Sequence, residues 1–398
     1  MKKLMTATAV TALMAGMASA EEIKIGVLLG FTGPIESTVA HMGPAAHMAI
    51  NEVNDSGKLL GGATVTGING DTTCVDSAAA TAAAERLITS DGVNGIVGGD
   101  CSGVTGAVLT NVAMPNGVVM ISPSATSPGL SHMNNEDNGL FFRTAPSDAR
   151  QGVVMTEVLM DQDITEVAVT YTNNDYGKGL ADAFQAAYEA AGGTVTISAP
   201  HDDGKADYSA EVGALASAGG QRLVVAGYVD QGGAGIVRAA LDTGAFDTFH
   251  FPDGMISDAL VENFGTEIDG STGQHPSPSV ELADLFTEVA TAAGADFEPT
   301  SPFAPESYDA AALIMLAMQS AGSSDPADYK SHIMAVANAP GEQINAGELA
   351  KGLEILAAGG EIDFVGGTGV ELVGPGEAAG NYREVLIEGG DDTTVRFR

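Results

Sequence analysis

Residues 93–114 combine a short apolar run, a glycine-rich turn and the start of a helix. They read Val93-Asn94-Gly95-Ile96-Val97-Gly98-Gly99-Asp100-Cys101-Ser102-Gly103, followed by the helical pattern of Val104–Met114. A second such junction places Ser122-Pro123-Ser124-Ala125-Thr126 after the apolar run Val118–Ile121. In open α/β sheets, ligands bind where parallel strands end, because helix amide groups converge there. The two turns therefore predict half of a binding site, although serine and threonine are also common as simple helix caps.

Around these turns, short β-rich runs alternate with longer helical patterns from Glu22 to Phe264. This alternation predicts βαβ units and parallel sheets, and there are too many units for one doubly wound domain. The extended stretch 140–146 interrupts the pattern, and a fresh set of units begins at Val167. A second break comes at 271–278, where two prolines and a glycine stand. We therefore predict an α/β fold with two doubly wound, parallel-sheet lobes.

The chain after residue 278 is mostly helical, and we expect these helices to return and cover the first lobe. In the tail, 361–365 and 369–372 predict a hairpin, and 382–387 predict a strand that crosses back to the second lobe. The predicted division is a signal peptide at 1–20, a first lobe of 21–145 plus 276–378, and a second lobe of 146–275 plus 379–398.

The first twenty residues have the three parts of a secretory signal peptide. Lys2-Lys3 supplies the positive start, Leu4–Met17 the apolar stretch and Ala18-Ser19-Ala20 the cleavage site. No cysteine follows directly, so we expect no lipid anchor and a periplasmic protein.

The chain is strongly acidic, with a formal charge of −36 that becomes −38 without Lys2 and Lys3. Such a charge excludes nucleic acid and anionic lipid as natural partners. The acidic residues are scattered, which suggests a solvating surface adapted to high salt.

Only two cysteines occur, Cys74 and Cys101, and both lie in the exported part. An even number of cysteines in an oxidising compartment favours a disulfide over two free thiols. Such a bond would tie the loop after the predicted strand 64–69 to the turn that carries Ser102.

Enzyme signatures are missing from the sequence. There is no G-x-S-x-G elbow, phosphate-binding loop, H-E-x-x-H or C-x-x-C. His41 and His47 have no third ligand nearby, so we expect no metal and no cofactor. The enzymatic alternative is a secreted hydrolase with Ser102 or Ser124 as nucleophile, but no nearby sequence suggests the histidine that it would need.

Several motifs, taken in order, give the chain a family resemblance over essentially its whole exported length. It resembles periplasmic solute-binding proteins of the leucine/isoleucine/valine type, the amino-acid receptors of ABC importers. The motifs are Lys24-Ile25-Gly26-Val27, Thr32-Gly33-Pro34, Gly98 to Ser102, Ile121 to Pro128, Phe142-Arg143-Thr144, Asn174 to Gly179, Gly227-Tyr228 and Phe251-Pro252-Asp253-Gly254.

The resemblance implies two lobes joined by three crossovers, with the ligand in the cleft between them. By position, Ser102 and Thr126 match hydroxyl residues that bind the ligand's carboxylate and ammonium, and Ser124 matches a place used through its backbone. Asp253 matches the carboxylate that faces the α-ammonium. Tyr176 and Tyr228 match tyrosines of the second lobe that close over the ligand. Cys74 and Cys101 match the family's disulfide.

Two positions depart from the family pattern, and both bear on the ligand's side chain. A tyrosine of the family is replaced by Thr38, and an apolar residue is replaced by Asp100, while Phe303 keeps an aromatic place on the pocket wall. A buried carboxylate needs a partner. We therefore hypothesise a polar or cationic side chain paired with Asp100, the alternative being that Asp100 caps the following helix.

The sequence thus predicts a monomeric, non-enzymatic binding protein that delivers an amino acid to the permease of an ABC importer. Binding proteins for small amides, urea or aromatic acids are the main alternative, because they share the fold and many motifs. The sequence leaves open whether the protein also presents its ligand to a chemoreceptor.

Overall fold

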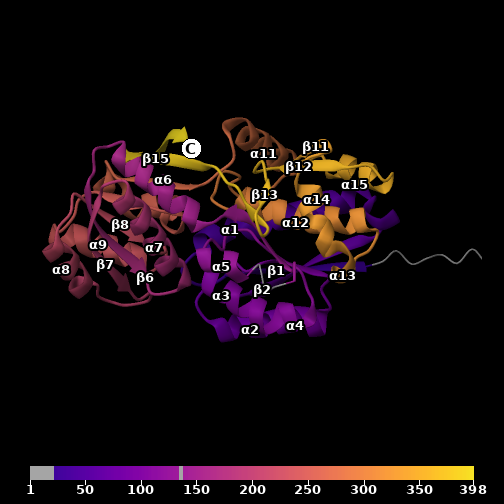
Figure 1. Ribbon diagram of the computed structural model, residues 1–398, viewed down its shortest axis with the longest axis horizontal. Helices are drawn as coiled ribbons and strands as arrows, with labels where there is room; N and C mark the ends of the chain where they lie inside the picture. The colour runs from indigo at the N-terminus through magenta and orange to yellow at the C-terminus, as the bar shows by residue number, and fades with distance from the viewer. Residues whose placement is uncertain (1–21, 134–137) are drawn as a thin grey trace, which may run out of the picture.

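The computed structural model describes residues 22–133 and 138–398, and these form two α/β lobes that lie side by side (Figure 1). The predicted signal peptide lies outside the described residues. Each lobe is built on a seven-stranded sheet flanked by helices. This is the predicted fold class, which the structural comparisons reported below confirm.

The first lobe is built on a sheet of mainly buried, β-branched and apolar strands. Strands β1 to β5 run parallel, as expected for a sheet covered on both faces. The strand order is β13 (Leu372–Val373), β14 (Glu377–Ala378), β5 (Phe141–Pro146), β4 (Met120–Ser122), β3 (Gly95–Gly98), β1 (Glu22–Leu29) and β2 (Thr64–Asp71).

Two long helices of the first lobe, α1 (Glu36–Ser56) and α12 (Ala304–Ala321), pack against each other. Helix α12 is buried from Ala304 to Gln319, because its sequence is apolar on nearly every side. Helices α2 and α3 also pack together and lie on the other side of the sheet (Figure 1). The remaining helices are α2 (Ser77–Glu85), α3 (Ser102–Val108), α4 (Met114–Asn116), α5 (Pro128–Met133), α11 (Val280–Ala292), α13 (Pro326–Tyr329), α14 (Ile333–Ala337) and α15 (Leu349–Ala357).

The second lobe repeats the arrangement. Helices α6 (Asp148–Met160) and α7 (Asp175–Ala190) pack together, as do α8 (Ser209–Ala218) and α9 (Gly232–Thr243), and α10 (Asp258–Phe264) follows β9. The strand order is β16 (Asp391–Phe397), β15 (Tyr382–Glu388), β10 (Thr272–Pro276), β9 (Phe249–Phe251), β8 (Arg222–Ala226), β6 (Glu166–Thr172) and β7 (Thr194–His201).

The C-terminal part differs from the prediction in its strand pairing. The predicted hairpin of 361–365 with 369–372 is wrong: β12 (Ile362–Gly366) pairs in parallel with β11 (Glu342–Asn345), and β13 pairs with β14. The proline-rich break at 271–278 contains a buried strand, β10, whose antiparallel partner is β15. Strand β15 does join the second sheet, as predicted, and each sheet has antiparallel pairing at one edge, β13 with β14 in the first and β15 with β10 and β16 in the second.

The chain passes between the two sheets three times, after β5, after β10 and after β14. We propose that the lobes divide where the sequence predicts, at 145/146, 275/276 and 378/379, because each boundary falls at or next to one of these passages. Three connecting segments between the same two lobes form a natural hinge. Among the described residues, no helix combines the length and the apolar character needed to span a lipid bilayer.

The acidic surface leads to a prediction about salt. With 52 acidic and 16 basic residues, charge repulsion opposes the compact state. Salt shortens the screening length from about 10 Å at 0.1 M to about 3 Å at 1 M. We therefore expect the free energy of unfolding, measured by urea titration, to rise with KCl over this range. Sucrose, which does not screen charge, serves as the control, and a stability independent of KCl would contradict the prediction.

Candidate functional site

A cavity lies between the lobes, beyond the carboxyl ends of β3, β4, β6, β8 and β9. It brings together eight of the nine side chains that the sequence singled out, from loops and helix starts far apart in the chain. The lining residues are Ile35, Thr38, Asp100, Cys101, Ser102, Ser124 and Phe303 from the first lobe, with Tyr176, Tyr228, Asp253 and Gly254 from the second. Both lobes therefore supply polar groups to one cavity.

Thr126 is the predicted residue that does not line this cavity. It is fully buried behind the turn, and its Oγ1 has no hydrogen-bond partner among the described residues. Its carbonyl accepts a hydrogen bond of 2.9 Å from the amide of Asp148. That Thr126 binds a ligand stays a prediction.

The two hydroxyl-rich turns of the first lobe hold each other in place. The Ser102 Oγ accepts a hydrogen bond from the Ser127 amide at 3.0 Å, and the Ser124 Oγ donates one to the Asp100 carbonyl at 3.1 Å. Behind them, the buried Arg143 donates from one guanidinium nitrogen to the carbonyls of Ala125 and Ser127, both at 3.0 Å. These contacts of Ser102, Ser124 and Arg143 all lie within the first lobe, and the Asp148 amide adds one from the second.

Asp100 is buried at the base of the first turn, and the protein satisfies both of its carboxylate oxygens. Oδ2 accepts from the Gly30 amide at 2.7 Å, and Oδ1 accepts from the Thr72 hydroxyl at 2.8 Å. Burial raises the pKa of Asp100, while these two hydrogen bonds oppose the rise. Asp100 does not cap α3, since the residue at the cap position is Cys101, with no side-chain hydrogen bond to the helix. It instead joins the ends of β1 and β2 to the turn.

The predicted disulfide between Cys74 and Cys101 is confirmed. It links the loop after β2 to the residue that precedes Ser102, and both cysteines are buried. The two sulfur atoms lie close to the Asp100 carboxylate. Because the bond uses both sulfurs, this group offers no thiolate to a metal ion.

The second lobe faces the turns with a carboxylate. Asp253 Oδ1 accepts hydrogen bonds from the Tyr176 hydroxyl at 2.6 Å and from the Gly254 amide at 2.9 Å. Asp253 is buried, which raises its pKa, and the Tyr176 hydroxyl opposes that rise. The Gln151 side chain also lies close to this carboxylate and opposes the rise in its pKa. This carboxylate lines the cavity and can therefore accept a hydrogen bond from a cationic or hydrogen-bond-donating ligand group.

Two stacked tyrosines stand beside this carboxylate. The rings of Tyr176 and Tyr228 lie 5.2 Å apart between centroids and within 17° of parallel. Tyr176 lies in the first turn of α7, after Asn174, whose side chain caps that helix and donates to the Tyr228 hydroxyl at 3.4 Å. Burial raises the pKa of both tyrosines well above the usual value, so both hydroxyls stay protonated.

Sequence reasoning missed a polar group behind Asp253. Gln151 accepts a hydrogen bond from the Asp253 amide at 3.2 Å and donates one to Asp148 Oδ1 at 2.9 Å. Burial raises the pKa of Asp148 well above its usual range, and the nearby charge of Asp253 adds to the rise. Asp148 and Gln151 belong to α6, the first helix after the crossover from the first lobe. Their spacing on an ordinary helix gives no sequence signal.

The remaining wall is less polar. Ile35 and Thr38 come from the start of α1, and Phe303 directly precedes α12 in a left-handed backbone conformation with φ of 65°. Ile35 was not singled out by the sequence, although it follows Thr32-Gly33-Pro34 directly.

The cavity measures about 30 Å³, which is room for one or two water molecules and not for an amino acid. An amino acid can therefore enter only if the lobes move apart.

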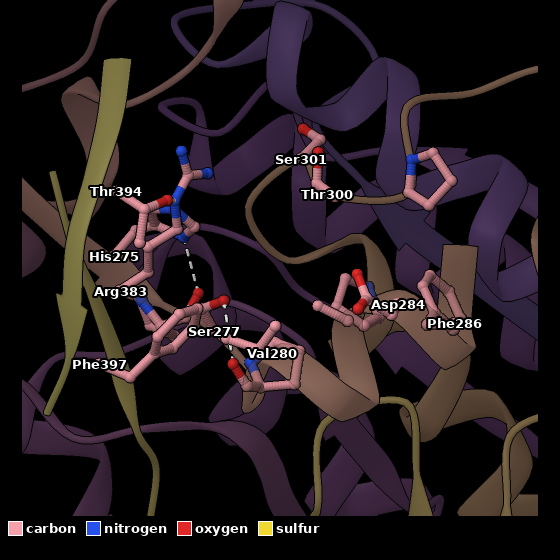
Figure 2. A pocket seen from close by; sticks show the side chains of 15 residues that line it. His275, Ser277, Val280, Asp284, Phe286, Thr300, Ser301, Arg383, Thr394 and Phe397 are labelled. Carbon is pink, nitrogen blue, oxygen red and sulfur yellow. Dashed lines mark hydrogen bonds between the residues drawn. The ribbon is translucent and has the colours of Figure 1, made fainter. Parts of the chain in front are cut away.

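A larger cavity of about 420 Å³ lies near the hinge, and none of the predicted site residues line it. Figure 2 shows Arg383, Thr394 and His275 on one wall, with Asp284 and Phe286 on α11 across from them. The charge of Arg383 is already used, since its guanidinium donates to Asp392 at 3.1 Å and to the Thr394 hydroxyl at 2.8 Å. The polar groups that could define a ligand therefore lie in the smaller cavity, to which both lobes contribute.

The sequence profile of a family described as periplasmic binding proteins matches residues 22–352. The chain is 30% identical over 332 residues to "Leu/Ile/Val-binding protein homolog 1" of Brucella melitensis, covering 82% of this chain and 86% of that protein. It is also 28% identical over 390 residues to "Chemotactic signal transduction system substrate-binding protein BasB" of Halobacterium salinarum, covering 94% of this chain and 89% of that protein.

Solved structures share the fold. A leucine-binding protein from Thermotoga maritima superposes with a TM-score of 0.77 at 22% identity, covering 94% of this chain and 98% of that one. A solute-binding protein of an ABC transporter from Rhodopseudomonas palustris, in complex with 4-hydroxybenzoate, superposes with a TM-score of 0.73 at 20% identity, covering 95% and 97%. The same fold thus occurs in a leucine-binding protein and in a protein that binds an aromatic acid.

Proposed function

Because the chain belongs to the family of periplasmic binding proteins, we propose that it captures an amino acid between its lobes and delivers it to an ABC importer. It is a solute-binding protein that works outside the cytoplasm, as its family implies. We place it in the periplasm after cleavage of residues 1–20. It acts as a monomer, since one chain supplies both walls of the cavity, and it performs no chemistry on the ligand.

The observation that carries this proposal is the pairing of opposite polarities across the cavity. Hydroxyl groups and the start of helix α3 at Ser102 lie in the first lobe, and the carboxylate of Asp253 lies in the second. A zwitterion loses water from both charges when a cleft shuts, so each charge needs replacement partners. Ser102 and Ser124 suit the carboxylate, Thr126 assists once the turn adjusts, and Asp253 suits the ammonium.

Closure follows from the same arrangement. A ligand that contacts Ser102 and Asp253 together bridges the lobes, and it can do so only when they are closed. Its differential affinity for the closed form therefore shifts the hinge equilibrium. The cavity of about 30 Å³ supports a hinge that opens before an amino acid binds.

The ligand's side chain would extend toward Thr38, Phe303 and Asp100. The hydrogen bonds from Gly30 and Thr72 already satisfy the Asp100 carboxylate, which weakens the hypothesis that a cationic side chain is its partner. We propose an uncharged, aliphatic side chain, in keeping with the leucine-, isoleucine- and valine-binding relatives. Asp100 then serves as a wall residue and as an anchor for the turn.

A ligand screen tests this proposal directly. We expect leucine, isoleucine or valine to raise the melting temperature by several degrees at millimolar concentration, because a ligand stabilises the form that it binds. Calorimetry should then give tighter binding for leucine than for lysine. Tighter lysine binding would restore Asp100 as a cation partner. Binding of 4-hydroxybenzoate without binding of any amino acid would overturn the amino-acid proposal, and turnover of a bound ligand in a mass-spectrometric time course would indicate a hydrolase.

A second candidate function is presentation of the ligand to a chemoreceptor. The similarity to the chemotactic substrate-binding protein of Halobacterium salinarum extends over 94% of this chain and supports it. The cavity and its ligand would be the same in both cases. Co-purification of the cross-linked, ligand-bound protein with a receptor rather than with permease subunits would distinguish the two.

A further inference from the structure

A carboxylate of the second lobe caps a helix of the first. Asp230 lies between β8 and α9, and Ser37 lies in the first turn of α1. Asp230 Oδ2 accepts hydrogen bonds from the Ser37 amide at 3.0 Å and from the Ser37 hydroxyl at 2.8 Å. We propose that Asp230 is a positioning residue that latches the lobes in the closed form without contacting the ligand. This inference rests on the proposed cleft-closing function.

The start of α1 needs such a partner. The first amides of a helix have no acceptor within the helix, and an N-terminal cap side chain usually supplies one. Here the cap position is occupied by Ile35, whose side chain cannot accept a hydrogen bond, and the first lobe provides no side-chain cap. The charge of Asp230 also suits the positive end of the helix dipole. Closure therefore gives α1 the cap that it lacks within its own lobe.

The contact is reciprocal and half-buried. The amide of Asp230 donates a hydrogen bond of 3.3 Å to the carbonyl of Pro34, directly before the helix. Asp230 and Ser37 are both partly shielded from water, so their interaction is screened less than an exposed ion pair. Three hydrogen bonds thus join the loop of Asp230 to the start of α1.

The latch and the cavity share two segments, the start of α1 and the loop between β8 and α9. Ile35 and Thr38 flank Ser37 and line the cavity from the first lobe. Tyr228 lies two residues before Asp230 and lines the cavity from the second. The approach that brings these walls together also brings Asp230 to Ser37. The latch therefore contributes to affinity by slowing reopening.

Asp230→Ala is the variant that tests the latch, with leucine as the probe. We expect leucine to bind about 3-fold to 10-fold more weakly, in line with the loss of an aspartate cap, and mainly through faster dissociation. Stopped-flow kinetics measures the dissociation rate and so distinguishes loss of the latch from an altered ligand contact. Asp230→Asn keeps a carbonyl oxygen for the Ser37 amide and should recover part of the loss.

The matched control is Asp325→Ala. Asp325 caps α13 by accepting from the Ala327 amide at 2.9 Å, entirely within the first lobe. This variant loses the same kind of cap and should leave the dissociation rate of leucine unchanged.

Small-angle X-ray scattering of the ligand-free protein provides a second measurement. The Asp230→Ala variant should have a larger radius of gyration than the wild type, since fewer molecules are closed. If leucine does not bind the wild-type protein, the proposed ligand is wrong and the scattering comparison decides on the latch alone. An unchanged radius of gyration, together with an unchanged dissociation rate where leucine binds, would overturn the latch.

Discussion

Replacement of Asp253 by alanine is expected to weaken amino-acid binding more than any other single substitution in the cavity. The Asp253 carboxylate at the cavity wall is the group best placed for the ligand's ammonium, and a buried charge that loses its partner costs about 1–3 kcal/mol or more. This corresponds to a rise in the dissociation constant of about 5-fold to 150-fold. Isothermal titration calorimetry with leucine measures it.

The ligand itself provides the sharpest control for this prediction. 4-Methylpentanoate is leucine without its amino group, so it has no charge for Asp253 to pair with. The Asp253→Ala variant should bind leucine far more weakly than the wild type but should not bind 4-methylpentanoate more weakly. An equal loss for both compounds would mean that the substitution has disturbed the cavity and that Asp253 does not face an ammonium.

A second control separates this effect from general damage to the segment. Asp258 lies five residues further along the same segment, is exposed, and does not line the cavity. Asp258→Ala should bind leucine as the wild type does. A thermal melt of Asp253→Ala should show a folded protein, since a buried carboxylate with a raised pKa is replaced by a small apolar group.

The parts of the site that the sequence predicted share one physical basis. In a parallel sheet the carboxyl ends of all strands meet at one edge, so turns that are far apart in the chain assemble there. The turns of Ser102 and Ser124 follow β3 and β4 in this way, and Tyr228 and Asp253 follow β8 and β9. The prediction that these side chains line one cavity came from the family resemblance and not from periodicity.

The parts that could not be predicted depend on pairings with no local signal. Strand β12 pairs with β11, about twenty residues earlier, and not with the segment that follows it, because that segment turns away to form β13. The two hydrogen bonds of Asp100 and the cap that Asp230 gives α1 join residues 28 to 193 positions apart. A sequence pattern reports short spacings, whereas the hydrogen bonds of Asp100 exist only once the first lobe has folded, and the cap from Asp230 only once both lobes have met.

Removal of the disulfide is expected to have the largest effect on stability. The bond closes a loop with a sequence separation of 27, and in the chain-entropy model such a loop contributes about 3.5 kcal/mol. For a lobe of roughly 200 residues this corresponds to a fall of about 7–14 °C in melting temperature. The double variant Cys74→Ala/Cys101→Ala, measured by calorimetric melting, tests this. Reductant should lower the melting temperature of the wild type similarly and leave the variant unchanged.

The same variant also shows what holds the binding turn. Asp100 is tied to Gly30 and Thr72 by two buried hydrogen bonds that do not involve the cysteines, and Ser102 is tied to the second turn. We therefore expect the dissociation constant for leucine to change by less than about 3-fold at a temperature where the variant is folded. A much larger loss would assign the positioning of Ser102 to the disulfide, and an unchanged melting temperature would contradict its stabilising role. Large loss of stability with little loss of affinity is the combination that identifies Asp100 as the residue that anchors the turn.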